Sequence, residues 1–207
     1  VYNNYYYVIN SLVVVFAVVH NSIRPVIGNL IITENFSKVW KSFRIINYFY
    51  QSCAVVCCAC CFVLLQDFEY NWGGSKNMLQ FNIVFLLVIY FFVGRISSVL
   101  VVFQEAAGIL WQGKFIPLIA AIVNLTVNIV LVHYIGLAGV LISSILSSLF
   151  ITFPGYTYIL FKYLFKEKFQ LKLFLKDSMW IVVQLFITIL LCYFTVSRIN
   201  VEGWFEF

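Results

Sequence analysis

Charged residues are scarce in this chain. Only 10% of its 207 residues are charged and 63% are hydrophobic, whereas a soluble domain of this size keeps roughly a quarter of its residues charged. This composition excludes an ordinary soluble domain and indicates an integral membrane protein. The net charge of +5 therefore reports mainly on membrane topology, and we expect no nucleic-acid partner.

Catalytic and metal-binding patterns are also missing. The sequence has no nucleophile elbow, paired acidic motif, phosphate-binding loop or metal-ligand spacing, and His20 and His133 lie in different segments without a motif around either. Five of the six cysteines fall between Cys53 and Cys61 in an apolar run, whereas zinc ligands usually come from turns. We interpret these cysteines as small apolar residues and predict no catalytic residue, no metal, no cofactor and no enzymatic activity.

Long apolar runs are what the sequence does contain. A helix needs about 20 apolar residues to cross the hydrocarbon core. Six segments reach about that length, at approximately residues 5–32, 45–65, 78–103, 115–134, 137–161 and 178–196. The turn at Gly136 is too short for anything but a reversal, so the fourth and fifth segments form a hairpin. The predicted fold class is an all-α, polytopic membrane helical bundle.

The positions of the basic residues predict the topology. Basic residues are enriched on the cytoplasmic side of membrane proteins, which places the lysine-rich stretch after the fifth segment inside. Strict alternation then puts nine basic residues inside and only Lys76 and Arg198 outside. The first residue is therefore predicted outside. Because six crossings from that start would leave the amino terminus to be translocated, we expect a further helix upstream in a longer protein.

Three regions follow from this pattern. Residues 1–162 are predicted to hold the first five helices, and residues 177–207 a sixth helix with an outward tail. Between them, residues 163–176 form a basic cytoplasmic segment in which lysines alternate with phenylalanine and leucine. We predict that Tyr163 to Leu175 forms a short amphipathic helix lying in the membrane interface.

Three charged residues in or near the membrane are candidates for function, because intramembrane charges usually face a cavity or a partner. Asn21 and Arg24 share one polar helical face, and Pro25 predicts a kink beside them. Arg24 either faces an anion-binding cavity or extends to the cytoplasmic interface. Arg95 and Glu105 lie within one sector but about 15 Å apart along their helix, so no direct ion pair is expected. Arg95 either pairs with a group elsewhere in the longer protein or contacts a substrate phosphate.

The hairpin carries polar residues on narrow faces. Asn124 and Asn128 are four residues apart, so they either hydrogen-bond a neighbouring helix or line a sugar path. Gly139, Ser143 and Ser147 repeat every four residues. Such a small-residue face lets two helices approach closely.

The run from Phe103 to Phe150 closely resembles the late hairpin of bacterial polysaccharide flippases, the polysaccharide transport branch of the multidrug/oligosaccharidyl-lipid/polysaccharide exporter superfamily. Similar features of that family are an Ala-Gly loop, a Lys-aromatic-x-Pro-Leu start, an Asn-Leu-x-x-Asn core and a Gly-Leu-x-Gly-Val turn. In this chain they are Ala107-Gly108, Lys114 to Leu118, Asn124 to Asn128 and Gly136 to Val140. The opening Tyr2 to Tyr5 and the run Ile27-Gly28-Asn29 also resemble the family, with Asn3 where serine is usual.

The resemblance implies one lobe of a MATE-like two-lobed transporter in the bacterial cytoplasmic membrane, with the amino-terminal lobe of the same protein missing here. Its implied partners are membrane lipids and an undecaprenyl-pyrophosphate-linked oligosaccharide, which the family moves to the outer leaflet for surface polysaccharide synthesis. Arg24 and Arg95 become candidates for phosphate contacts and Asn124 and Asn128 for the sugar side. Asn21 and Glu105 complete the predicted substrate-binding set. A drug or cation antiporter of the same superfamily is the alternative, and a membrane polysaccharide polymerase or ligase is a weaker one.

Overall fold

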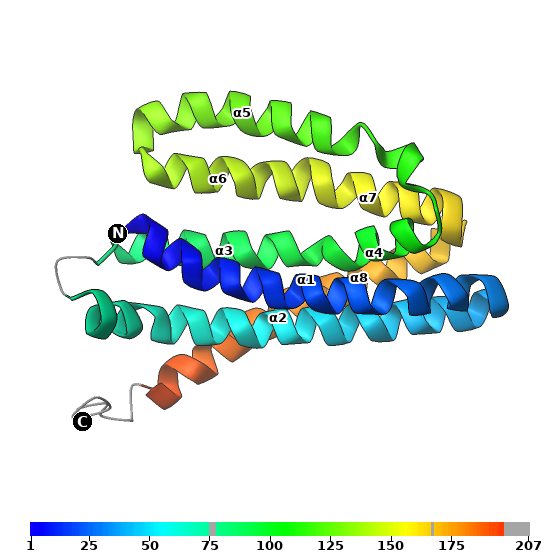
Figure 1. Cartoon of the computed structure of the whole chain (residues 1–207), viewed down its shortest axis with the longest axis horizontal. Helices are drawn as coiled ribbons and strands as arrows, with labels where there is room; N and C mark the ends of the chain where they lie inside the picture. Colours follow the sequence, from blue (N-terminus) through cyan, green and yellow to red (C-terminus); the bar gives the residue numbers. More distant parts are fainter. Residues whose placement is uncertain (75–77, 167, 197–207) are drawn as a thin grey trace.

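Long helices running side by side form the whole of the described structure. The computed structural model describes residues 1–74, 78–166 and 168–196, and within these ranges it contains no β-strand (Figure 1). The helices are α1 (Tyr2–Thr33), α2 (Phe36–Gly73), α3 (Phe81–Ile96), α4 (Ser98–Ala106), η2 (Leu110–Gly113), α5 (Ile116–Ile135), α6 (Leu137–Ser147), η3 (Ser148–Thr152), α7 (Phe153–Leu160), η4 (Phe161–Phe165) and α8 (Lys168–Val196).

Six membrane-spanning stretches emerge from these elements. Within the described ranges their bounds are Tyr2–Thr33, Phe36–Trp72, Phe81–Ala106, Leu110–Ile135, Leu137–Phe165 and Gln170–Thr195, and each is long and apolar enough to cross a bilayer. The prediction of an all-α polytopic helical bundle is therefore confirmed.

The connections alternate between the two ends of the bundle. The α1–α2 turn, the α4–α5 connection and the η4–α8 connection lie at one end, and the amino terminus and the α5–α6 turn lie at the other (Figure 1). The three connections at the first end are the ones whose basic residues predict a cytoplasmic location. The predicted outside residues Lys76 and Arg198, and the tail after residue 196, lie outside the described residues.

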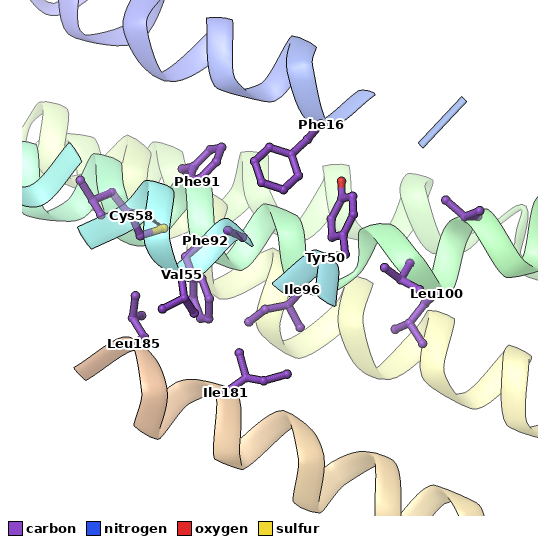
Figure 2. Close-up of a cluster of buried hydrophobic side chains, with 14 of the residues drawn as sticks. Phe16, Tyr50, Val55, Cys58, Phe91, Phe92, Ile96, Leu100, Ile181 and Leu185 are labelled. Atoms are coloured by element: carbon purple, nitrogen blue, oxygen red, sulfur yellow. Dashed lines mark hydrogen bonds between the residues drawn. The ribbon is translucent and has the colours of Figure 1, made fainter. Parts of the chain in front are cut away.

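The core is built around α3 and α4, which have apolar side chains on most of their circumference. α3 packs on α2 and α6, while α1 covers α4. Figure 2 shows Phe16 of α1 on one side of core residues from α2 and α3, and Ile181 and Leu185 of α8 on the other side. Cys58 is fully buried in this cluster, where it acts as a small apolar residue. α5 has no buried residue and packs mainly on α6.

The connections before and after the predicted segment 45–65 are shorter than the bounds of the apolar segments predict, because their polar residues belong to helices. The predicted segments 5–32 and 45–65 leave residues 33–44 as their connection, but α2 already begins at Phe36. The Asn35 side chain caps this helix by accepting a hydrogen bond from the Lys38 backbone N–H at 3.0 Å. At its other end α2 continues to Gly73, so most of residues 66–77 is helical. Charged residues at a membrane interface can adopt helical structure, so α2 extends beyond its apolar part at both ends.

The basic segment between the fifth and sixth spans also differs from the prediction. Tyr163 to Leu175 does not form a separate interfacial helix, because η4 ends at Phe165 and α8 runs unbroken from Lys168. Phe165 and Phe174 are 1% exposed and pack on Phe43 of α2, with ring centroids 5.0 and 5.7 Å away. The aromatic residues of this segment thus belong to the protein core. They form part of an aromatic cluster that joins α2, α4, η4 and α8 at the end of the bundle that carries the α1–α2 turn.

Candidate functional site

Arg95 lines a small cavity near the middle of the bundle. The cavity has a volume of about 160 Å³ and lies between α1, α3 and η3. Asn10 and Tyr6 line it from α1, and Ser148 lines it from η3. Arg95 lies near the end of α3, about halfway along the span Phe81–Ala106. The cavity therefore combines one cation with several neutral hydrogen-bonding groups at membrane depth.

The guanidinium of Arg95 is not satisfied by its surroundings. Its Nε is buried without a hydrogen-bond partner, and no acidic side chain in residues 1–74, 78–166 or 168–196 pairs with it. Its Cζ lies 5.9 Å from the centroid of the Phe91 ring, which is a weak cation–π contact. An intramembrane cation with a buried donor and no counter-ion is unfavourable alone, and a bound anion would relieve it.

The helices on both sides of this cavity are irregular at the same level. The span through α3 and α4 is interrupted at Ser97, where the Gln51 side chain donates to the Ile96 carbonyl at 3.5 Å and Ser98 Oγ donates to the Gly94 carbonyl at 3.3 Å. Serine hydroxyls that bond the preceding turn weaken and bend helices. The third predicted segment, 78–103, is one span, Phe81–Ala106, with an interruption of its helix at Ser97.

Opposite this break, η3 is a π-helical turn. Pro154 follows it and has no N–H to donate to the carbonyl of Phe150. The widened turn starts at Ser148, which lines the cavity. π-Turns and broken transmembrane helices recur at functional sites, because they free backbone groups and reshape the surface.

A second charged cluster lies at the end of the bundle predicted to be cytoplasmic. Glu105 Oε2 of α4 is 3.2 Å from Arg24 Nη1 and 3.2 Å from His20 Nε2, both on α1. The side chains of His20 and Glu105 are 18% and 22% exposed, whereas that of Arg24 is 51% exposed. α1 continues through Pro25 to Thr33. One carboxylate oxygen thus holds two groups from successive turns of α1.

His20 was not among the sequence-predicted site residues. It precedes Arg24 by four residues, so both project toward the same side of α1, and this spacing was a usable signal. The partner could not be found in the same way, because Glu105 is 85 residues from His20 along the chain. As the sequence predicted, Arg95 makes no ion pair with Glu105.

The remaining predicted site residues lie apart from both clusters. Asn21 is exposed on α1. Asn124 of α5 donates to Ser144 Oγ at 3.0 Å and Ser147 Oγ at 3.3 Å, both on α6. Asn128 is half-buried, and its Oδ1 has no hydrogen-bond partner. The hydrogen bonds of Asn124 match the interhelical alternative, and Asn124 is not among the residues that line the Arg95 cavity.

The two clusters lie along one seam. Both contain residues of α1 and of the span formed by α3 and α4, and they are separated by about 21 Å, taken from Asn10 to Arg24 at 1.5 Å per residue. A negatively charged ligand moving along α1 would meet Arg24 near one membrane surface and Arg95 near the middle. The seam is therefore the candidate functional site of the chain.

We expect the Arg24–Glu105 pair to contribute little to stability. Half-exposed ion pairs are typically worth about 0.2–1 kcal/mol. A double-mutant cycle with Arg24→Gln and Glu105→Gln, measured by thermal unfolding in detergent, should give a coupling energy in that range. Asp67→Asn is the control partner. Asp67 lies near the carboxyl-terminal end of α2, at the opposite end of the bundle from Arg24, so its coupling to Arg24→Gln should be zero. A coupling above about 2 kcal/mol would identify the pair as structural.

Comparison of the chain with protein-family models, with curated proteins and with solved structures found no match.

Proposed function

We propose that this chain forms one lobe of a flippase that moves undecaprenyl-pyrophosphate-linked oligosaccharide repeat units to the outer leaflet of the bacterial cytoplasmic membrane. The observation that carries this proposal is Arg95, a mid-membrane guanidinium with a buried donor and no acidic partner among the described residues. Arginine is suited to phosphate because its planar fork donates two parallel hydrogen bonds. A diphosphate supplies the charge and the acceptors that this cavity lacks.

The two clusters have different roles in this proposal. Arg24 is already neutralised by Glu105, so a diphosphate arriving from the cytoplasmic end has to compete with that carboxylate for Arg24. Arg95 has no such competitor and attracts the diphosphate further into the membrane. Asn10, Tyr6 and Ser148 offer neutral hydrogen bonds around the bound group. The opposite wall of the path would come from the amino-terminal lobe that the family resemblance implies.

One observation favours a cation antiporter instead. Glu105 is a partly buried carboxylate on the seam, and acids in such positions bind protons or cations in transporters. In this structure, however, Glu105 is held by Arg24 and His20, and the cation at mid-membrane repels positively charged drugs. The electrostatics of the described part of the seam therefore favour an anionic substrate.

The proposal is tested by deleting the gene of the full-length protein and following lipid-linked repeat units. We expect these units to accumulate with their sugars on the cytoplasmic side, so that a lectin labels them in inverted membrane vesicles and not in right-side-out vesicles. Complementation with the gene should restore labelling on the outer side. Unchanged labelling, together with increased sensitivity to cationic drugs, would replace the flippase by the antiporter.

A further inference from the structure

A larger hollow lies between α2 and α8, away from the candidate seam. Its volume is about 740 Å³, and it is lined by Trp40, Lys41, Arg44 and Tyr48 of α2 and by Asp177 of α8. α8 packs on the side of the α2–α3 layer opposite to α1 (Figure 2). Its α2 lining residues lie in the first half of that helix, which begins at the α1–α2 turn (Figure 1), and the basic residues predict this turn to be cytoplasmic. It therefore opens toward the membrane surface of that side.

Two side-chain contacts brace the walls of this hollow. Arg44 Nε donates to Asp177 Oδ2 at 2.8 Å, and Arg44 Nη2 donates to Asp177 Oδ1 at 3.1 Å, which is a bidentate pair. One helix turn deeper, Gln184 of α8 donates to the hydroxyl of Tyr48. These contacts link α2 to α8 and fix the distance between the two helices around the hollow.

The charge of the hollow is positive because none of the described acidic residues pairs with Lys41. Arg44 and Asp177 cancel each other, and Lys41 is exposed and makes no ion pair with any residue the structure describes. The exposed guanidinium edge of Arg44 and the ammonium of Lys41 are one helical turn apart on α2. Trp40 and Tyr48 add the amphipathic rings that are enriched at membrane interfaces.

A second, smaller hollow continues the same helix pair toward the membrane centre. It has a volume of about 180 Å³, and its apolar lining residues Val55, Val56 and Ile187 alternate with the polar residues Ser52, Gln184 and Thr188. Ser52 lines both hollows. From Lys41 to Val56, α2 rises about 22 Å at 1.5 Å per residue. The two hollows thus present a cationic group toward the membrane surface and, below it, a groove whose apolar side chains are Val55, Val56 and Ile187.

We propose that the α2–α8 hollows bind one anionic glycerophospholipid of the cytoplasmic leaflet, with its phosphate at Lys41 and Arg44 and one acyl chain along Val55, Val56 and Ile187. Basic pockets between transmembrane helices on this side bind anionic lipid head groups for the same electrostatic reason. A zwitterionic head group fits less well, because Asp177 is already paired and cannot hold a second cation. A free phosphate would leave the apolar groove unused.

This lipid site does not depend on the proposed transport activity. It lies on the other side of the α2–α3 layer from α1, and it shares no residue with the Arg95 cavity or with the Glu105 cluster. Loss of the lipid and loss of transport can therefore be measured separately. The failure of one proposal leaves the other intact.

The test uses the purified full-length protein and native mass spectrometry. Phosphatidylglycerol and phosphatidylcholine with identical acyl chains are titrated against the wild type and against Lys41→Ala. We expect phosphatidylglycerol to bind more tightly than phosphatidylcholine, and Lys41→Ala to weaken it about five-fold, which corresponds to about 1 kcal/mol for one basic residue near the membrane surface. Lys41 is exposed, so the variant should fold normally.

Two further variants keep the result specific. Lys114→Ala removes the same charge from the same end of the bundle but outside the hollow, so it should leave phosphatidylglycerol binding unchanged. Ile187→Trp fills the apolar groove at an exposed position and should weaken both lipids. Equal binding of the two lipids, equal effects of Lys41→Ala and Lys114→Ala, or competition by inorganic phosphate at millimolar concentration would overturn the proposal.

Discussion

Replacement of Arg95 by alanine in the full-length protein is expected to reduce export of lipid-linked repeat units by about ten- to hundredfold while leaving the protein folded. A hydrogen bond to a charged group is worth about 1.5–3 kcal/mol, and Arg95 is the mid-membrane cation available for the diphosphate. Its buried Nε has no partner to lose. Truncation therefore removes an unsatisfied donor, and the thermal stability of the protein should be unchanged or slightly higher.

Export is measured from the lectin labelling of repeat units in right-side-out vesicles at matched protein levels, and stability from thermal unfolding of the same samples. Arg95→Lys is the matched variant, because it keeps the charge and loses the bidentate fork. It should retain intermediate activity. A large fall in stability with Arg95→Ala would assign the arginine to packing, and normal export would remove Arg95 from the transport path.

Substitution of Gly139 is expected to have the largest effect on folding. A Cβ at this position of α6 would lie 2.6 Å from the carbonyl carbon and 2.7 Å from the carbonyl oxygen of Leu131 in α5. These are backbone atoms and cannot rotate away. Forcing extra atoms into a packed contact typically costs about 1–3 kcal/mol, and here Gly139→Val pushes two helices of a hairpin apart. We expect the valine variant to yield little folded protein.

The control for Gly139 is another helical glycine. Gly94 of α3 has open space around its missing Cβ, with no atom within 4 Å. Alanine there should be neutral or stabilising by about 0.5–1 kcal/mol, because glycine weakens a helix interior. Gly139→Ala, which adds only the Cβ, and Gly94→Ala are compared by size-exclusion profile and thermal unfolding in the same detergent. Similar behaviour of Gly139→Ala and Gly94→Ala would show that the close approach of α5 and α6 does not limit stability.

The hairpin of α5 and α6 is an example of structure that can be predicted from local sequence. Its turn at Gly136 has a positive φ of 57°, which glycine adopts without strain, and the small face at Gly139, Ser143 and Ser147 is buried as expected. The length of the apolar runs was likewise sufficient for the number of spans in the described part of the chain. These properties depend on hydrophobicity and on close neighbours along the chain, so no tertiary information was needed to predict them.

Other features depended on contacts between distant segments. Phe165 and Phe174 lie in a stretch where lysines alternate with apolar residues, a pattern typical of an interfacial helix. In the structure both rings are buried against the ring of Phe43. The break at Ser97 involves a hydrogen bond from Gln51, 45 residues away from Ile96. Periodicity along one helix cannot reveal such partners, because it defines a face without showing what covers that face.

The candidate site likewise has some features that the sequence determines and others that depend on tertiary contacts. The sequence by itself determined that Arg24, Arg95 and Glu105 are rare charges in a membrane-spanning chain and that Arg95 and Glu105 are too far apart to pair. Only the tertiary structure decided that Glu105 holds Arg24 together with His20, that Asn124 bonds to α6, and that Arg95 has no counter-ion among the described residues. The physical reason is that an intramembrane charge is stabilised or left unsatisfied by the helices packed around it, and packing brings together residues more than 80 positions apart.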